Sequence, residues 1–482
     1  MTVARARLRG LLREHWLFCL VFVAATLVRA AMQSAFGPAL FYLGDSFDYL
    51  EAGYGLHLDQ GHPWGYPLIL AVLALPGRSL AVIAIAQHLA GLVTGVLVYA
   101  LLLRLRVHRV VAAAAAALVL LNSYTVVLEQ HVMAESFFTL ALMASVYLVI
   151  TRTGPVATAG GGLLLGAATL VRAAGIFAAP VWFAYVVWKR RVPRAIATAA
   201  LAVAFPIVGY ASISAGVGGG FGLTEWGGWL LYGRVAAIAD CRLVDVPAET
   251  RALCETPQER AGRRARRWKP SNYVFDSDSP AHRLYGPAVT AGPSPALRRF
   301  ALAVIRDRPL EYGRIVARDL TYYFRPASLR TGFDPGIILH EQLEPADLLQ
   351  DAPTVRRYFP GYRVEKHPPV RAVVEYNERA RPPRPLLAAL LLSALLSLVL
   401  ALVGRGRPAL PRQRESTFLA LLALALVVGP TAVVELNLRF LVPVLPLIAC
   451  AGALALSDLG ALAAVAWRKR RGGHARPASI AH

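Results

Sequence analysis

Charged side chains are scarce in this sequence of 482 residues. Asp, Glu, Lys and Arg make up 17% of the chain, whereas hydrophobic residues make up 56%. A soluble domain carries about 25% charged residues. The scarcity therefore excludes an ordinary water-soluble protein and indicates a chain whose solvent is partly lipid.

Acidic residues are the scarcer of the two charged classes, with 29 Asp and Glu against 51 Lys and Arg, and the formal net charge is +22. Such an excess can indicate nucleic-acid binding. Much of the basic charge here, however, lies in short tracts beside apolar runs, where it sets membrane topology. No nucleic-acid partner is expected.

Nucleotide-binding motifs are missing too, because the sequence has neither a P-loop nor a GxGxxG segment after a strand. Cysteines are few, and two of the four, Cys19 and Cys450, lie inside apolar runs and are expected to be buried thiols. Cys241 and Cys254 lie in a polar loop. They are candidates for a disulfide in an oxidising compartment, but their spacing alone leaves two free thiols open.

Long apolar runs are what the sequence has in abundance, and a helix needs roughly twenty apolar residues to cross a bilayer. The pattern predicts an all-α polytopic membrane protein with about ten transmembrane helices, one large loop and short interfacial helices in the first loop. The predicted segments are 16–36, 80–103, 110–127, 133–150, 158–171, 173–188, 195–213, 385–403, 417–434 and 440–459.

Basic residues in the connections all fall on one side of the membrane if the ten segments are real. They are Arg5, Arg7, Arg9, Arg13, Arg104, Arg106, Arg109, Arg152, Lys189, Arg190, Arg191, Arg194, Arg405, Arg407, Arg412, Arg414, Arg468, Lys469, Arg470 and Arg471. The positive-inside rule then predicts a multi-pass protein of the plasma (inner) membrane with both termini in the cytoplasm. Segments 39–77 and 214–384 are then expected outside. The chain divides into a transmembrane module at 1–213, an extracytoplasmic loop or domain at 214–384, and a C-terminal three-helix transmembrane segment with a basic cytoplasmic tail at 385–482.

The first outside loop carries three carboxylates within seven residues, Asp45, Asp48 and Glu51. A short apolar piece at 68–75 follows, too short to span and better placed as a helix in the interface. Acidic residues at a bilayer surface suggest chemistry, but Asp45 could equally cap a helix that begins at Ser46.

A second acidic position, Glu135, is expected at the outside mouth between the third and fourth segments, where Glu129 also lies. Arg172 and Arg439 are expected at the same depth. Guanidinium groups match phosphate geometry, and a carboxylate beside a hydroxyl can act as a general base. The alternative is that these groups form ion pairs that only stabilise helix ends.

The order of these motifs resembles the GT-C superfamily of lipid-linked-sugar glycosyltransferases, which includes protein mannosyltransferases, aminoarabinose transferases and mycobacterial arabinosyltransferases. The matching features are Asp45 with Tyr49, the segment 65–68, Glu135, the segment 169–172 that ends in Arg172, and the segment 439–446 that begins with Arg439. The seven-helix family module would cover about residues 16–213.

The resemblance implies that Asp45 deprotonates the acceptor, that Glu135 orients the acceptor or a metal, and that Arg172 holds the donor phosphate with help from Arg439. The base is open between Asp45 and Asp48. No cofactor is certain. A divalent cation at Asp45 and Glu135 is open, because two carboxylates do not define a ligand set.

Aromatic and imidazole side chains are further candidates for substrate binding, namely His62, Tyr66, Trp226 and Trp229. Trp and Tyr rings can stack on sugars, although anchoring at the membrane interface explains them equally well.

The sequence thus predicts a membrane glycosyltransferase, inverting, that moves a sugar from a polyprenyl-phosphate donor to an extracytoplasmic glycan, lipid or protein acceptor. The expected partners are that donor, the acceptor and membrane lipids. Two other classes stay open. A transporter or flippase of lipid-linked intermediates would carry inverted repeats, and none is visible; a non-catalytic membrane scaffold would not need Asp45.

Overall fold

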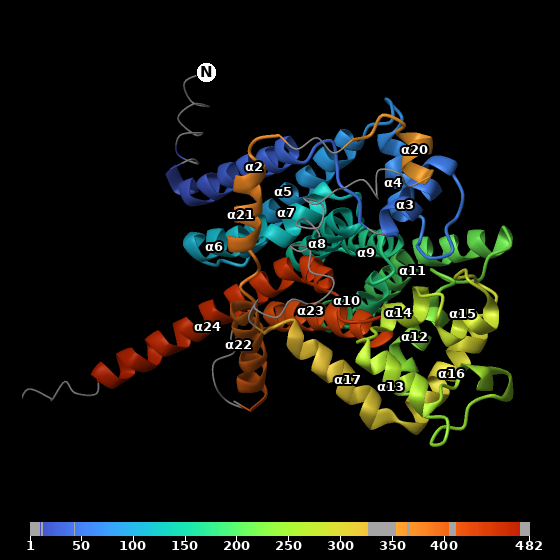
Figure 1. The fold of residues 1–482 in the computed structure, drawn as a ribbon. Coiled ribbons are helices and arrows are strands. Elements are labelled where there is room, and N and C mark those ends of the chain that lie inside the picture. Colours follow the sequence, from blue (N-terminus) through green and yellow to red (C-terminus); the bar gives the residue numbers. More distant parts are fainter. Residues whose placement is uncertain are drawn as a thin grey trace, which may run out of the picture.

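Helices make up the regular structure of the protein in the computed structural model, which describes residues 10, 13–42, 44–325, 353–363, 367–403 and 411–472. One isolated bridge, between Leu40 and His131, is the exception within these ranges. The all-α prediction is therefore confirmed for the described part of the chain (Figure 1). Five of the basic residues expected on the cytoplasmic side, Arg5, Arg7, Arg9, Arg405 and Arg407, lie outside the described residues.

The helices of the membrane part are α2 (Trp16–Ala35), α5 (Leu80–Arg104), α6 (Arg109–Leu120), α7 (Ser123–Gln130), α8 (Glu135–Thr151), α9 (Pro155–Val171), α10 (Gly175–Arg190), α11 (Pro193–Gly216), α22 (Arg384–Val403), α23 (Gln413–Val433), η2 (Leu438–Val444) and α24 (Leu445–Gly472). The first loop contains α3 (Asp45–Gly55) and α4 (Gly65–Leu73). The large loop contains α12 (Gly227–Ala236), η1 (Ala248–Leu253), α13 (Pro257–Ala265), α14 (Pro270–Phe275), α15 (Pro280–Tyr285), α16 (Ser294–Asp307), α17 (Pro309–Tyr322), α20 (Pro353–Tyr358) and α21 (Val370–Arg379).

Five stretches within the described residues are long and apolar enough to cross a membrane, namely α2, α5, α11, α23 and the stretch Leu438–Ala464. Counting each of two bent pairs, α6 with α7 and α21 with α22, as one span raises the number to seven. The chain is therefore a multi-pass membrane protein. The predicted count of ten is not confirmed, since apolar helices such as α8 and α9 have only 17 residues each.

The predicted third span, 110–127, is wrong as a single helix. It breaks between α6 and α7 with a bend of 44°. Two polar groups explain the break: Asn122 Oδ1 accepts from the amides of Tyr124 and Thr125 and so caps a new helix. In addition, Arg29 Nη1 donates to the Leu120 carbonyl oxygen at 2.8 Å, which occupies an acceptor at the end of α6.

Part of the large loop has an apolar core of its own. Trp229, Tyr232 and Phe300 are fully buried there, between α12, α14 and α16. These helices lie at the lower right of Figure 1, in green to yellow, and α12 contacts α23. The Tyr312 hydroxyl of α17 donates to the Ala432 carbonyl oxygen of α23 at 3.0 Å, so this core is joined to the end of a candidate span.

The two helices of the first loop, α3 and α4, lie together at the upper right of Figure 1, with α20 beside them. Helix α3 begins at Asp45, one residue earlier than the capping alternative requires. Gly44 is its N-cap residue, and no side chain caps it. The Asp45 carboxylate is therefore not used as a cap and is available for other contacts.

Candidate functional site

Two carboxylates and two guanidinium groups meet in one cluster. Arg439 Nη1 donates to Asp45 Oδ2 at 2.5 Å, and its Nε lies 3.8 Å from Glu135 Oε1. Arg172 Nη1 donates to the same Glu135 oxygen. Arg439 thus lies between the two acidic residues, and the four groups form a continuous chain of charges.

Four separate elements supply these groups. The aspartate opens α3, where Gly44 adopts a φ of 76° that L side chains rarely take. The glutamate is the first residue of α8, and Arg172 follows the last residue of α9. Arg439 lies in η2, and its amide donates to the Asn437 side chain that caps this helix. Each charged group is therefore placed by a helix end.

The first loop is held in register with the segment that precedes Glu135. The Leu40 amide donates to the Gln130 carbonyl oxygen, and the Val132 amide donates back to the Leu40 carbonyl oxygen, both at 2.9 Å. The Ser46 hydroxyl, next to Asp45 in the chain, donates to the Val132 carbonyl oxygen at 2.8 Å. These bonds set the distance between the two acidic positions.

Gln87 of α5 is a positioning residue that sequence reasoning missed. Its Nε2 donates to the carbonyl oxygens of Glu129 and His131, at 2.7 and 2.6 Å. Its Oε1 accepts from the Tyr66 hydroxyl at 2.6 Å and from the Met133 amide at 3.2 Å. Gln87 and Tyr66 are both fully buried. The polar pair Gln87 and His88 inside an apolar run was the available signal.

Gly65 allows α4 to pack directly against the end of α9. A Cβ atom at this position would lie 2.4 Å from the Leu170 carbonyl carbon and 2.5 Å from the Val171 nitrogen. Only glycine permits so close an approach of two backbones. Because Arg172 follows directly after this contact, Gly65 sets the place of that guanidinium relative to the first loop.

The cluster is shielded but not sealed. Glu135 is fully buried, whereas 22% of the Asp45 side chain and 15% of the Arg439 side chain stay exposed. Glu135 Oε2 and Arg439 Nε have no hydrogen-bond partner within the described residues. Buried polar atoms are normally paired, so these two atoms are under-satisfied, although Arg439 Nε faces Glu135 Oε1 at 3.8 Å.

A histidine lies beside the cluster. His62 Nδ1 is 2.8 Å from Asp59 Oδ2, and its Nε2 lies 3.9 Å from Asp45 Oδ1. The ring is flanked by Tyr49 at 4.7 Å and by Trp226 at 6.0 Å between centroids. Sequence reasoning named His62 and Trp226 but missed Asp59, which orients the imidazole. The spacing of three residues between Asp59 and His62 was the only signal for it.

The carboxyl groups of the site have divergent pKa values. Burial raises the pKa of Asp45, but the attraction of Arg439 and of His62 outweighs it and holds the pKa below its usual value. Burial raises the pKa of Asp48 to about 6, although His62 opposes the shift. Burial lowers the pKa of His62, and the hydrogen bond to Asp59 together with the nearby carboxylates outweighs that and raises it.

A metal ion, if the site holds one, fits Asp48, Asp59 and His62. Their ligand atoms lie within 4.8 Å of one another, and two carboxylates with an imidazole are a common donor set for divalent cations. The two residues predicted from sequence, Asp45 and Glu135, are instead each paired with an arginine.

Two other predicted residues lie away from the cluster. Trp229 is fully buried in the core of the large loop, where its Nε1 donates to the Thr290 carbonyl oxygen at 2.8 Å. Glu129 is not a residue of the outside mouth. It is fully buried and pairs with Arg29 and with His88 Nδ1, at 2.8 and 2.9 Å. Its carboxylate oxygens are therefore used by Arg29 and His88 inside the bundle and are not directed at the cluster.

Comparisons with known proteins found little. No protein-family model matches the chain, and no curated protein matches it. One similar solved structure is an archaeal oligosaccharyltransferase, AglB from Archaeoglobus fulgidus, in complex with an inhibitory peptide and a dolichol-phosphate. The TM-score is 0.38 at 12% identity, over 98% of this chain and 53% of the other. This chain thus spans about half the length of that protein, and a likeness at this level carries no argument about the site.

Proposed function

We propose that this protein is a membrane glycosyltransferase that moves a sugar from a polyprenyl-phosphate donor to an acceptor hydroxyl at the membrane surface. The proposal depends on one observation above all. Two carboxylates and two guanidinium groups from four distant elements meet beside a histidine.

Phosphate binding is assigned to the two arginines. A polyprenyl-phosphate sugar keeps its tail in lipid and its headgroup at the interface, and the proposal puts the ends of α8 and α9 at that level. Arg439 Nε has no hydrogen-bond partner among the described residues, and a guanidinium group offers five N–H donors. The pair with Asp45 uses Nη1, so another N–H of the guanidinium group can donate to a phosphate oxygen without first breaking that pair.

The reaction follows from these placements. The acceptor oxygen attacks the anomeric carbon, the bond from that carbon to the phosphate oxygen breaks, and polyprenyl phosphate leaves with the electron pair. Negative charge grows on the phosphate in the transition state, so Arg172 and Arg439 stabilise it more than the ground state. The acceptor proton goes to a carboxylate of the first loop.

Asp45 and Asp48 are the two candidates for the base, and they differ in their surroundings. Asp45 is paired with Arg439 and has a lowered pKa, which favours a role in orienting the guanidinium. Asp48 has a pKa of about 6, close to the value at which a general base works well near neutral pH. A divalent cation bound by Asp48, Asp59 and His62 would supply Lewis-acid stabilisation of the leaving phosphate.

The test is transfer in vitro from a panel of polyprenyl-phosphate sugars, with wild type, Asp45→Asn and Asp48→Asn in parallel. Loss of the base lowers kcat by about 10²- to 10⁴-fold, and the two variants show which residue holds that role. Asp245→Asn is the matched control, because Asp245 is an exposed aspartate of the large loop. Full activity in both site variants would remove the base from the first loop.

The same assay separates the other classes. A flippase would move the lipid-linked sugar across the bilayer without breaking its bond to phosphate, and a scaffold would do neither. Transfer that is absent from every donor, with translocation that survives Asp45→Asn, would contradict the proposal.

A further inference from the structure

A cavity of about 490 Å³ opens in the large loop, near the disulfide between Cys241 and Cys254. Its lining includes four arginines and a single acidic residue: Arg242, Arg260, Arg264 and Arg308 with Asp240. A neighbouring hollow of about 210 Å³ is lined by three arginines and two acids, so its charges nearly balance. The excess of positive charge is specific to the larger cavity.

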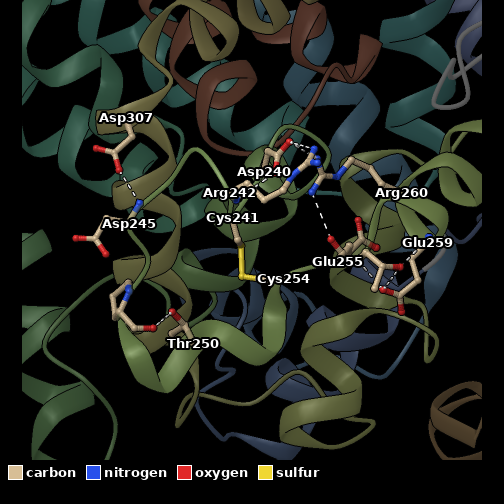
Figure 2. Close-up of a disulfide and its surroundings, with 12 residues drawn as sticks. Asp240, Cys241, Arg242, Asp245, Thr250, Cys254, Glu255, Glu259, Arg260 and Asp307 are labelled. Carbon is tan, nitrogen blue, oxygen red and sulfur yellow. Dashed lines mark hydrogen bonds and ion pairs between the residues drawn. A yellow bond between two sulfur atoms is a disulfide. The ribbon is translucent and has the colours of Figure 1, made fainter.

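Asp240 arranges two of the four guanidinium groups. Arg242 Nη2 lies 2.9 Å and Arg260 Nη1 lies 3.3 Å from Asp240 Oδ2. Figure 2 shows both arginines converging on this carboxylate beside the disulfide. The Arg264 side chain makes no ion pair or hydrogen bond with any residue that the structure describes. Asp240 therefore balances one of the two guanidinium groups that it orients, while Arg308 pairs with Glu311 at 3.1 Å outside the lining, and a net positive charge remains.

The disulfide joins the two walls of the cavity. Cys241 stands between Asp240 and Arg242 in the chain, and Cys254 precedes α13, which carries Arg260 and Arg264. The two Cα atoms are 5.9 Å apart. The cross-link therefore holds both walls at one spacing, which preorganises the arginines for a ligand.

The cavity lies close to the end of a membrane span. Arg308 precedes α17 by one residue, and Tyr312, one helical turn later, donates to the Ala432 carbonyl oxygen in the last turn of α23. Two leucines beside the lining arginines are exposed: Leu243 by 65% and Leu310 by 71%. Arginines next to exposed apolar side chains, close to the end of a candidate span, are typical of a surface in contact with lipid.

We propose that this cavity binds the phosphate headgroup of an anionic phospholipid, with Leu243 and Leu310 in contact with the acyl region. Guanidinium groups match the geometry of phosphate oxygens. A lipid would also cover the exposed leucines with its acyl chains, whereas a free anion would leave them in water. The site anchors the large loop to the bilayer surface and is independent of the glycosyl transfer proposed above.

Lipid binding to the full-length protein in detergent tests the proposal. Native mass spectrometry would measure retention of short-chain phosphatidylglycerol, short-chain phosphatidylcholine and inorganic phosphate. We expect wild type to retain phosphatidylglycerol over phosphatidylcholine. The double variant Arg242→Gln/Arg264→Gln should weaken that retention about thirtyfold, the loss expected for two basic residues at an anionic surface.

The matched control is Arg266→Gln/Arg283→Gln, which removes the same charge from the neighbouring hollow and should leave retention unchanged. The double variant Leu243→Ser/Leu310→Ser should weaken the retention of phosphatidylglycerol but not the retention of inorganic phosphate. Equal retention of the two lipids by wild type, or an equal loss of phosphatidylglycerol retention in the control variant, would overturn the proposal. Competition by millimolar phosphate with no effect of the leucine changes would show a free anion as the ligand and overturn the assignment to lipid.

Discussion

Gly65→Ala adds a single methyl group at the point where α4 touches α9, and the structure allows its effect to be estimated. The new Cβ would lie 2.4 Å from the Leu170 carbonyl carbon, whereas ordinary contacts begin at 3.4 Å. The obstructing atoms belong to the backbone, so no side-chain rotation relieves the clash. Helix α4 must therefore move by about 1 Å from the end of α9, the difference between these two distances.

A shift of that size separates the first loop from Arg172, which follows α9 directly. A misplacement of about 1 Å can cost about 100-fold in rate, and overpacking costs about 1–3 kcal/mol of stability. Gly65→Ala should therefore lower kcat about 100-fold while the protein still folds. Steady-state transfer from the polyprenyl-phosphate donor and thermal unfolding in detergent measure the two effects.

Gly209→Ala is the control for this prediction. Gly209 lies in α11, and a Cβ there would meet nothing within 4 Å. The control should keep wild-type transfer and melt at or slightly above the wild-type temperature, because Ala is favoured over Gly inside a helix by up to about 1 kcal/mol. If Gly65→Ala were as active and as stable as Gly209→Ala, the contact between α4 and α9 would not position Arg172, and the reasoning would fail.

Three further changes test separate parts of the structure. Glu129→Gln should destabilise the protein by about 3–5 kcal/mol, because it leaves Arg29 buried without its partner; Arg29→Met/Glu129→Met should cost less, and chemical denaturation compares them. Asp48→Asn should raise the melting temperature at pH 7.5 but not at pH 4. The pKa of Asp48 is about 6 in the folded protein against 3.8 ordinarily, so the wild-type fold loses stability as pH rises from about 4 through 6, when the carboxyl ionises. Melting curves recorded with a chelator would contradict this if the variant and wild type differed in melting temperature by the same amount at both pH values. Cys241→Ser/Cys254→Ser should cost about 3 kcal/mol, since the bridge spans 13 residues of chain, and wild type treated with reductant should melt at the same temperature as the variant.

The all-α membrane character could be predicted because hydrophobicity is a property of short stretches of sequence. Apolar runs near residues 16–36, 80–103 and 417–434 coincide with helices of the structure. The break after Leu120 could not be predicted in this way. It depends on the Asn122 cap of α7 and on Arg29, whose partner carbonyl lies 91 residues away in the chain, and a hydropathy pattern contains no information about either.

Acidic and basic residues of the candidate site were recognisable one by one, but their partners were not. Asp45 had two interpretations, a helix cap and a member of a charged cluster. The structure pairs it with Arg439, 394 residues away. Asp59 was overlooked because a single aspartate in a polar loop is unremarkable until the imidazole of His62 is found beside it.

Long apolar runs with basic residues beside them indicate a membrane protein before any helix packing is known. Tertiary structure alone decided which charged groups meet, which tryptophan lies beside His62 and which is buried in the large loop. The physical reason is range: burial preference acts on each residue and its near neighbours, whereas an ion pair needs two side chains brought within about 4 Å by every helix that lies between them.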